Sequence, residues 1–142
     1  MEVTQETQQD VSSNGPQRFR FTREQRIRSG SDFDRAYGYK QRVGNNHLLV
    51  FGVPNGLQHT RIGLSVSKKH GNAVRRSRMK RLLREAFRLS QYELPAGLDL
   101  VLIPRQNSGA GLGEYQKSLI HLARKILSRI EAKQNEQKKA ES

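Results

Sequence analysis

The sequence predicts an α+β fold, a small mixed β-sheet packed with helices. Two observations support this class. Apolar residues recur at helical spacing in residues 73–88 and 114–130. Short runs rich in Leu, Val, Ile and Phe, which are typical of strands, occupy residues 47–53, 60–66 and 98–103. Strands and helices are therefore interspersed along one short chain, and the apolar faces of the helices can cover the sheet.

The two ends of the 142-residue chain differ in composition from the part between them. Residues 1–17 are polar, and their only charged side chains are the acids Glu2, Glu6 and Asp10. Such a segment cannot bury enough surface to fold alone, so we expect a disordered acidic tail. We expect a single domain over residues 18–131 and a flexible C-terminal tail over residues 132–142.

A short helix and two strands are expected in the first half of the domain. Ser31 can cap a helix in which Phe33 and Tyr37, four residues apart, share one face. The strands at residues 47–53 and 60–66 flank a Pro-Asn-Gly turn sequence. We expect these two strands to pair as a hairpin.

The last strand and helix are separated by a loop. Residues 98–103 predict a buried strand that Pro104 ends. Residues 106–113 are rich in Gly, Ser and Asn and predict a flexible loop. The helix at residues 114–130 should pack on the sheet through an apolar stripe at helical spacing, formed by Tyr115, Leu119, Leu122, Ile126 and Ile130.

Charge is concentrated in the strand, loop and helix of residues 61–88. This segment contains ten Lys or Arg and one acid, Glu85, so that it carries a net charge of +9 out of the chain's +13. Residues 67–71 read as the loop that crosses from the strand to the helix. Asn72 is a favourable N-cap for that helix, which we expect over residues 73–88.

This helix has an apolar arc and a basic arc when its residues are set out at 100° each. The apolar arc holds Met79, Leu82, Leu83, Ala86 and Phe87. The basic arc holds Arg76, Lys80, Arg81, Arg84 and Arg88. Like charges four residues apart cost about 0.2–0.5 kcal/mol per pair, and the helix dipole disfavours cations at the N-terminus. Selection for stability alone would remove these charges, so we infer that the basic arc faces a polyanion.

The same loop and helix resemble the signature of the bacterial ribonuclease P protein subunit. Residues 66–74 read VSKKHGNAV and residues 76–85 read RSRMKRLLRE. The family pattern is VSKK-x-GNAV followed by a helix with R-N-x-x-K-R-x-x-R-E. Ser77 departs from this pattern, which usually has Asn there. The resemblance extends more weakly from about Arg20 to Arg129.

This resemblance implies the element order α-β-β-β-α-β-α, with an early strand near residues 41–45 and the basic helix in a βαβ crossover. It implies the protein subunit of an endoribonuclease that removes the 5′ leader from precursor tRNA. The RNA subunit would be the catalyst and would use Mg²⁺, and the protein would have no activity and no bound cofactor of its own. The expected partners are the catalytic RNA and the 5′ leader of precursor tRNA.

Two RNA-binding surfaces can be assigned on this resemblance and on the chemistry of the side chains. The first, called the basic surface below, would hold the catalytic RNA with Lys68, Lys69, Arg76, Ser77, Arg78, Lys80, Arg81 and Arg84. The second, the aromatic cleft, would stack bases of the leader on Phe33, Tyr37 and Phe51. An aromatic pair four residues apart on a helix also suits a hydrophobic core, and the sequence leaves both roles open.

Composition argues against several other classes of protein. The chain has no Cys, which excludes thiolate catalysis and Cys-ligated zinc, and its four His residues are scattered. Asp32 and Asp34 are the nearest to a carboxylate pair, but residues two apart on a helix do not face each other. We therefore expect no catalytic residue and no metal site in the protein.

Charge and hydropathy also bear on where the protein acts. The pI near 10.8 fits a nucleic-acid partner. No apolar run approaches the ~20 residues that span a bilayer, and residues 1–17 lack the features of a signal peptide. We expect a cytoplasmic protein whose partners are RNA, with no membrane and no DNA among them.

The basic helix admits two other interpretations. A structural RNA-binding module of the ribosomal type would share a basic helix on a small sheet, but not the loop-and-helix signature. A membrane-surface or calmodulin-binding helix would need its apolar arc exposed, whereas here the core needs that arc.

Overall fold

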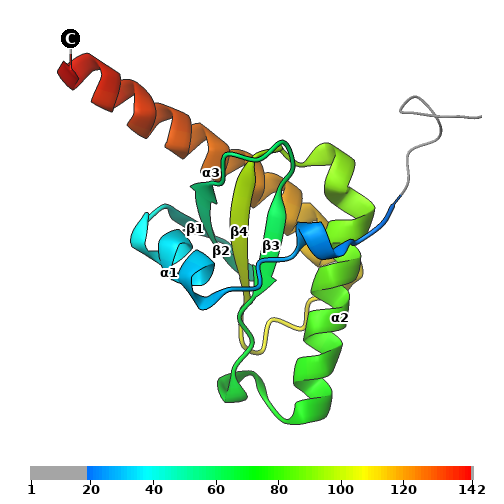
Figure 1. The fold of residues 1–142 in the computed structure, drawn as a ribbon. Helices are drawn as coiled ribbons and strands as arrows, with labels where there is room; N and C mark the ends of the chain where they lie inside the picture. Colours follow the sequence, from blue (N-terminus) through cyan, green and yellow to red (C-terminus); the bar gives the residue numbers. More distant parts are fainter. Residues whose placement is uncertain (1–18, 142) are drawn as a thin grey trace, which may run out of the picture.

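The computed structural model describes residues 19–141, so the acidic tail expected at residues 1–17 lies outside the described part of the chain (Figure 1). The helices and strands follow in the order α1 (Gly30–Gly38), β1 (Arg42–Gly44), β2 (Leu48–Pro54), β3 (Arg61–Leu64), α2 (Ala73–Ser90), β4 (Leu98–Pro104) and α3 (Leu112–Glu141). The α+β class and the order α-β-β-β-α-β-α are confirmed, including the early strand implied near residues 41–45.

The described strands form a four-stranded mixed sheet in the order β1-β2-β4-β3. β2 pairs antiparallel with both β1 and β4, and β3 pairs parallel with β4. The hairpin predicted between residues 47–53 and 60–66 is therefore wrong, because β4 lies between β2 and β3. β4 is buried along nearly its whole length and takes an interior position, whereas the four-residue β3 forms an edge. The βαβ crossover is present as β3-α2-β4.

The two faces of the sheet pack against different helices. Leu100 points into the larger core with α2 and α3, and its neighbour Val101 points into a smaller core with α1. In Figure 1, α3 passes behind the sheet and α1 lies in front of it. α3 approaches the sheet closely at Gly52, where an added Cβ would lie 2.4 Å from Cγ2 of Ile126. This glycine lets the last helix lie flat against the central strands.

α1 begins two residues earlier than the predicted cap allows. Its N-cap is Ser29, whose hydroxyl accepts a hydrogen bond from the backbone N–H of Asp32 at 3.1 Å, and not Ser31. Both serines are suitable caps by residue type. The choice depends on tertiary structure, because the backbone N–H of Ile27 bonds to the carbonyl of Ile62 in β3 and fixes where the chain turns into α1.

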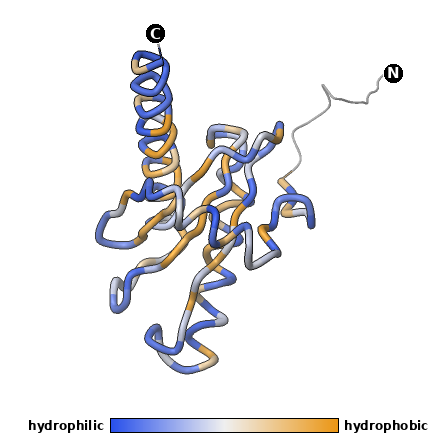
Figure 2. Tube along the Cα trace, turned by 60° about the vertical axis from the view of Figure 1, so that its left-hand side comes forward, coloured by the Kyte–Doolittle hydropathy of each residue, from blue (hydrophilic) through white to orange (hydrophobic). Residues whose placement is uncertain are grey.

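α3 extends well past its predicted end at Ile130. The helix continues to Glu141, so the predicted helix end at Ile130 is wrong, while the flexibility expected for residues 132–142 stays a prediction. The apolar stripe does end at Ile130, but the following Glu, Ala, Lys and Gln residues are strong helix formers. Lys133 also holds the extension, lying 3.9 Å from the ring centroid of Tyr39. Beyond this contact the helix projects from the domain and is largely hydrophilic (Figure 2).

Candidate nucleic-acid interface

The loop before α2 is fixed to the sheet by a buried histidine. Nδ1 of His70 accepts from the backbone N–H of Ser67 at 3.0 Å. Nε2 then carries the ring hydrogen and donates to the carbonyl of Pro104 at 2.7 Å. The His70 side chain is only 8% exposed and anchors the loop to the end of β4. The anchored loop holds Lys68 and Lys69 exposed.

α2 begins where the sequence predicts. The side chain of Asn72 accepts from the backbone N–H of Arg75 at 2.9 Å and caps the helix. Three of the predicted apolar residues, Leu83, Ala86 and Phe87, are buried, and Leu82 packs partly buried against the same core.

Most of the basic surface is open to solvent. Two of its eight residues, Arg76 and Lys80, are half-buried. The other six are exposed, namely Lys68, Lys69, Ser77, Arg78, Arg81 and Arg84. No ion pair between described residues uses any of these side chains. Arg88, which belonged to the predicted basic arc, differs because it pairs with Glu85 and donates to the carbonyl of Phe19. The basic surface therefore keeps its charge available, while Arg88 serves the fold.

Arg76 does not lie fully on the predicted basic arc. It is seven residues before Leu83, so it shares the azimuth of the buried face. Its Nε is buried and has no hydrogen-bond partner among the described residues. At 100° per residue Arg76 falls between Leu83 and Phe87, so its assignment to the basic arc was wrong.

The three aromatic residues predicted for the cleft lie together on the face of the sheet that carries α1. Tyr37 of α1 meets Phe51 of β2 edge to face, with ring centroids 4.9 Å apart. Phe33 lies over Gly63 of β3, where an added Cβ would be 2.6 Å from the ring. All three rings are half-buried, and they pack against the smaller core. They are thus both packing residues and partly accessible surfaces.

The aromatic cleft and the basic surface meet in one pocket of about 200 Å³. Phe33 lines this pocket together with Lys80 and Arg84 of α2. Tyr37 and Phe51 do not line it, so only one of the three aromatic rings faces the charges directly. The structure also adds Phe21 and Arg26 to the wall, and Arg26 lies 4.6 Å from the centroid of the Phe21 ring. Sequence reasoning missed this cation–π pair because a single Phe within an arginine-rich segment carries no periodic signal.

A buried acid holds α1 in place over the sheet. Asp99 of β4 is fully buried and accepts two hydrogen bonds from Arg61, at 2.8 and 2.5 Å. It also accepts from Arg35 of α1 at 2.9 Å and from the side chain of Asn55 at 3.0 Å. Arg61 in turn lies 3.3 Å from Asp32 of α1. The hydrogen bonding that Arg61 donates to Asp99 is the main cause that raises the pKa of Arg61, against the opposing effect of burial.

Asp32, the acid that came nearest to a carboxylate pair, also belongs to this network. Asp32 pairs with Arg61, and the network as a whole joins α1 to β3 and β4. Asp99 was not singled out from the sequence, although a signal was present. A charge within the apolar strand LDLVLIP must find partners when it is buried.

The described residues contain neither a cluster of metal-binding side chains nor a membrane-spanning helix. Within residues 19–141, no three His, Cys, Asp or Glu side chains come together as ligands for a metal ion. In the same range, no helix has the length and apolar character required to cross a bilayer.

Comparisons with known proteins were made for the sequence and for the fold. The family model described as Ribonuclease P matches residues 21–127. The ribonuclease P protein component of Alkaliphilus metalliredigens is 37% identical over 102 residues, which cover 71% of this chain and 92% of that protein. The counterpart from Lachnoclostridium phytofermentans is 37% identical over 112 residues, covering 77% of this chain and 97% of that protein.

Solved structures agree with this result. The RNase P protein from Thermotoga maritima superimposes with a TM-score of 0.65 at 30% identity, covering 70% of this chain and 96% of that chain. The RNase P protein from Staphylococcus aureus gives a TM-score of 0.62 at 35% identity, covering 70% of this chain and 93% of that chain.

Proposed function

Since the chain belongs to the ribonuclease P protein family, we propose that its basic surface binds the catalytic RNA and that its aromatic cleft binds the 5′ leader of precursor tRNA. The chain is the protein component of an endoribonuclease, and an RNA subunit is its partner. The proposal concerns which surface meets which RNA.

The observation that carries the proposal is the pocket where Phe33 lies beside Lys80 and Arg84. Unpaired bases stack on aromatic faces, and lysine and arginine hold phosphates. A pocket that offers both suits a single strand whose bases are unpaired. The 5′ leader is such a strand, whereas the structured catalytic RNA presents mainly its phosphates to the outer side of α2.

We assign the chemical step and its Mg²⁺ to the RNA subunit. The acids nearest the cleft, Asp32 and Asp99, both form ion pairs with Arg61. These pairs give both acids a role in holding the fold together. The protein contributes binding energy to a cytoplasmic ribonucleoprotein. The purified protein without RNA should therefore leave precursor tRNA uncleaved in Mg²⁺, and cleavage above the buffer blank would overturn this assignment.

The leader site can be tested by reconstituting the holoenzyme with Tyr37→Ala. Stacking is worth about 1–3 kcal/mol per base, so affinity for precursor tRNA should fall about 5- to 150-fold while affinity for mature tRNA stays unchanged. Tyr92→Ala, at a half-exposed ring outside the cleft, is the matched control. An equal loss for both tRNAs, or a large fall in melting temperature alone, would return Tyr37 to a packing role.

The basic surface has a separate test in the salt dependence of binding to the catalytic RNA alone, without precursor tRNA, so that Lys80 and Arg84, which also line the leader pocket, report only this contact. Each lost phosphate contact should flatten the slope of log K against log[salt] by up to ~0.9, the value for B-DNA. Lys80→Gln and Arg84→Gln should each show this change. Lys125→Gln removes one charge from the exposed side of α3 and should not. Unchanged slopes in both α2 variants would place the basic surface away from RNA.

A further inference from the structure

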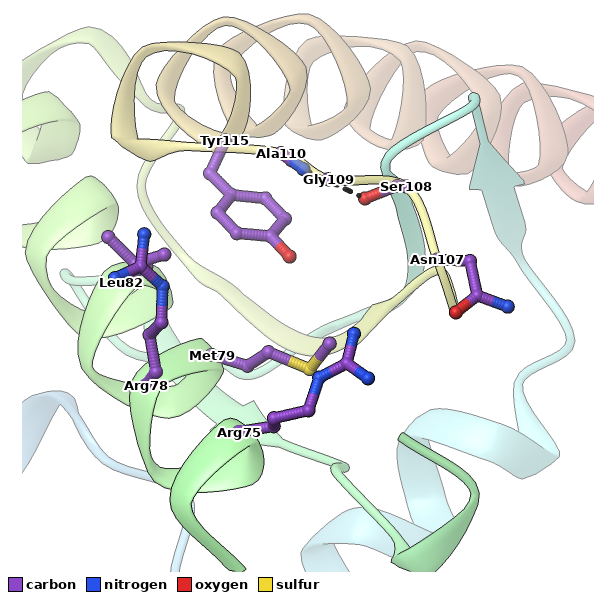
Figure 3. Close-up of a pocket in the computed structure, with 9 residues that line it drawn as sticks. All are labelled: Arg75, Arg78, Met79, Leu82, Asn107, Ser108, Gly109, Ala110 and Tyr115. Carbon is purple, nitrogen blue, oxygen red and sulfur yellow. Dashed lines mark hydrogen bonds between the residues drawn. The ribbon is translucent and has the colours of Figure 1, made fainter. Parts of the chain in front are cut away.

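A second pocket, of about 180 Å³, lies between α2 and the loop that precedes α3 (Figure 3). Residues 107–110 of that loop form one wall. Four side chains spaced at i, i+3, i+4 and i+7 along α2 form the other, namely Arg75, Arg78, Met79 and Leu82. Tyr115 of α3 closes the back, and its hydroxyl points into the space between the walls (Figure 3).

This pocket is distinct from the aromatic cleft but continuous with the basic surface. Lys80, which lines the cleft, is two residues from Leu82 and so about 200° away around the helix axis. Arg78, in contrast, also lines a shallow groove on the outer side of α2 together with Ser77 and Arg81. A molecule bound along the basic surface therefore passes the mouth of this pocket.

Two hydrogen bonds brace the loop wall, one within the loop and one to the start of α3. The hydroxyl of Ser108 accepts from the backbone N–H of Ala110 at 3.2 Å, the dashed line in Figure 3. Oε1 of Glu114 accepts from the backbone N–H of Gly111 at 2.8 Å, which lowers the pKa of Glu114 and ties the loop to the start of α3. The flexible loop predicted at residues 106–113 thus forms a defined wall.

The chemistry of the lining is positive at the mouth and apolar inside. None of the nine lining residues is acidic, and Arg75 and Arg78 supply two guanidinium groups. Met79, Leu82 and the ring of Tyr115 supply apolar surface. Tyr115 is 2% exposed, and burial raises the pKa of its phenol above an ordinary value that already keeps the hydroxyl protonated at neutral pH. The volume is below the 300–1,000 Å³ usual for small-molecule sites and suits part of a nucleotide.

We propose that this pocket binds one unpaired nucleotide of the catalytic RNA, with its phosphate at Arg75 and Arg78 and its base against Met79, Leu82 and Tyr115. The inference rests on the proposed function, since it needs RNA along the basic surface. It adds a specific anchor to a surface that otherwise offers only phosphate contacts, which position an RNA without reading its bases.

The first test uses the free protein and the four nucleoside 5′-monophosphates, with inorganic phosphate as the comparison. The amide NMR signals of Ala110 and Gly111 should shift, and the nucleotides should bind at least tenfold more tightly than phosphate. Arg75→Gln should weaken nucleotide binding about tenfold through loss of a charge-assisted hydrogen bond. Lys125→Gln should have no effect. Equal affinity for phosphate and nucleotides would remove the base contact and overturn the proposal.

The second test locates the nucleotide in the holoenzyme. Because the chain has no cysteine, a single one can carry a photoreactive label without interference. Gln106→Cys places the label beside the pocket, and Gln137→Cys places it on the projecting end of α3 as a control. A label at 106 should crosslink to one discrete position of the catalytic RNA, and Arg75→Gln should reduce the yield. Equal yields from 106 and 137 would refute the site.

Failure of this inference can be told apart from failure of the proposed function. If Lys80→Gln and Arg84→Gln weaken RNA binding while Arg75→Gln matches Lys125→Gln, the pocket is not a nucleotide site and the proposed function stands. If none of the three α2 variants weakens binding, both proposals fall.

Discussion

Replacing Asp99 with Asn tests whether the buried network positions α1. The change is nearly isosteric, so it removes charge without leaving a cavity. An amide oxygen in place of Oδ1 can still accept from Arg61 and Asn55. The amide nitrogen in place of Oδ2 would face the Nη2 groups of Arg61 and Arg35, donor against donor. Two of the four hydrogen bonds to Asp99 should therefore be lost.

The expected cost can be worked from burial. Breaking a fully buried ion pair costs about 3–5 kcal/mol. The Arg35 side chain is 43% exposed, so solvent screening reduces the contribution of its ion pair with Asp99 to stability. Arg61 keeps Asp32 as a counter-charge. We expect a loss of about 3 kcal/mol in the free energy of unfolding, which corresponds to about 10 °C in melting temperature for a domain of this size.

Urea unfolding is the assay. The midpoint urea concentration should fall, while the slope of the unfolding free energy against urea concentration should stay unchanged. Asp34→Asn, at an exposed position of α1, is the matched control and should change stability by less than about 0.5 kcal/mol. In the holoenzyme, Asp99→Asn should also reduce the preference for precursor over mature tRNA, because α1 carries two of the cleft aromatics. A loss below about 1 kcal/mol would mean that water already shares the network and that the reasoning is wrong.

Three further variants test other parts of the structure. Gly63→Ala should cost about 1–3 kcal/mol and weaken leader binding, since its Cβ would lie 2.6 Å from the Phe33 ring; calorimetry and precursor affinity measure both effects. The pKa of Tyr115 is raised, so the stability it contributes is complete below its unfolded value near 10 and is lost as pH rises above it. Tyr115→Phe should therefore flatten the fall in unfolding free energy above pH 10, and an unchanged alkaline slope would contradict this. Ser77→Asn restores the family's usual residue at an exposed position and should leave assembly with the RNA unchanged or mildly tighter, as measured by RNA affinity.

Local signals sufficed for the parts of the fold that depend on local chemistry. The Asn72 cap, the buried residues of α2 and the apolar stripe of α3 are all as the sequence predicts. Pairing between strands is not local. The Pro-Asn-Gly sequence does mark the end of β2, but nothing near it shows that β4 comes between β2 and β3.

The candidate site also has features that local sequence predicts and features that depend on distant parts of the chain. The exposure of most basic-surface residues follows from their positions on the helix, and so does the partial burial of Arg76, which shares the azimuth of Leu83. The partners of Asp99 come from α1, β3 and the turn after β2, so no sequence window contains them together. The end of α3 was missed because periodicity reports packing, while residues 131–141 are helical by propensity.

The central position of β4 has a consequence for how the protein is made. β4 is the last strand in the chain, yet it is the strand that connects β3 to the β1–β2 pair. Until residues 98–104 leave the ribosome, the β1–β2 pair and β3 lack the strand that joins them, although the local signals of α2 are already complete. Such non-local pairing slows folding and leaves strand edges open to association with other chains. In the growing chain the basic helix α2 is therefore complete in sequence before the sheet beneath it can close.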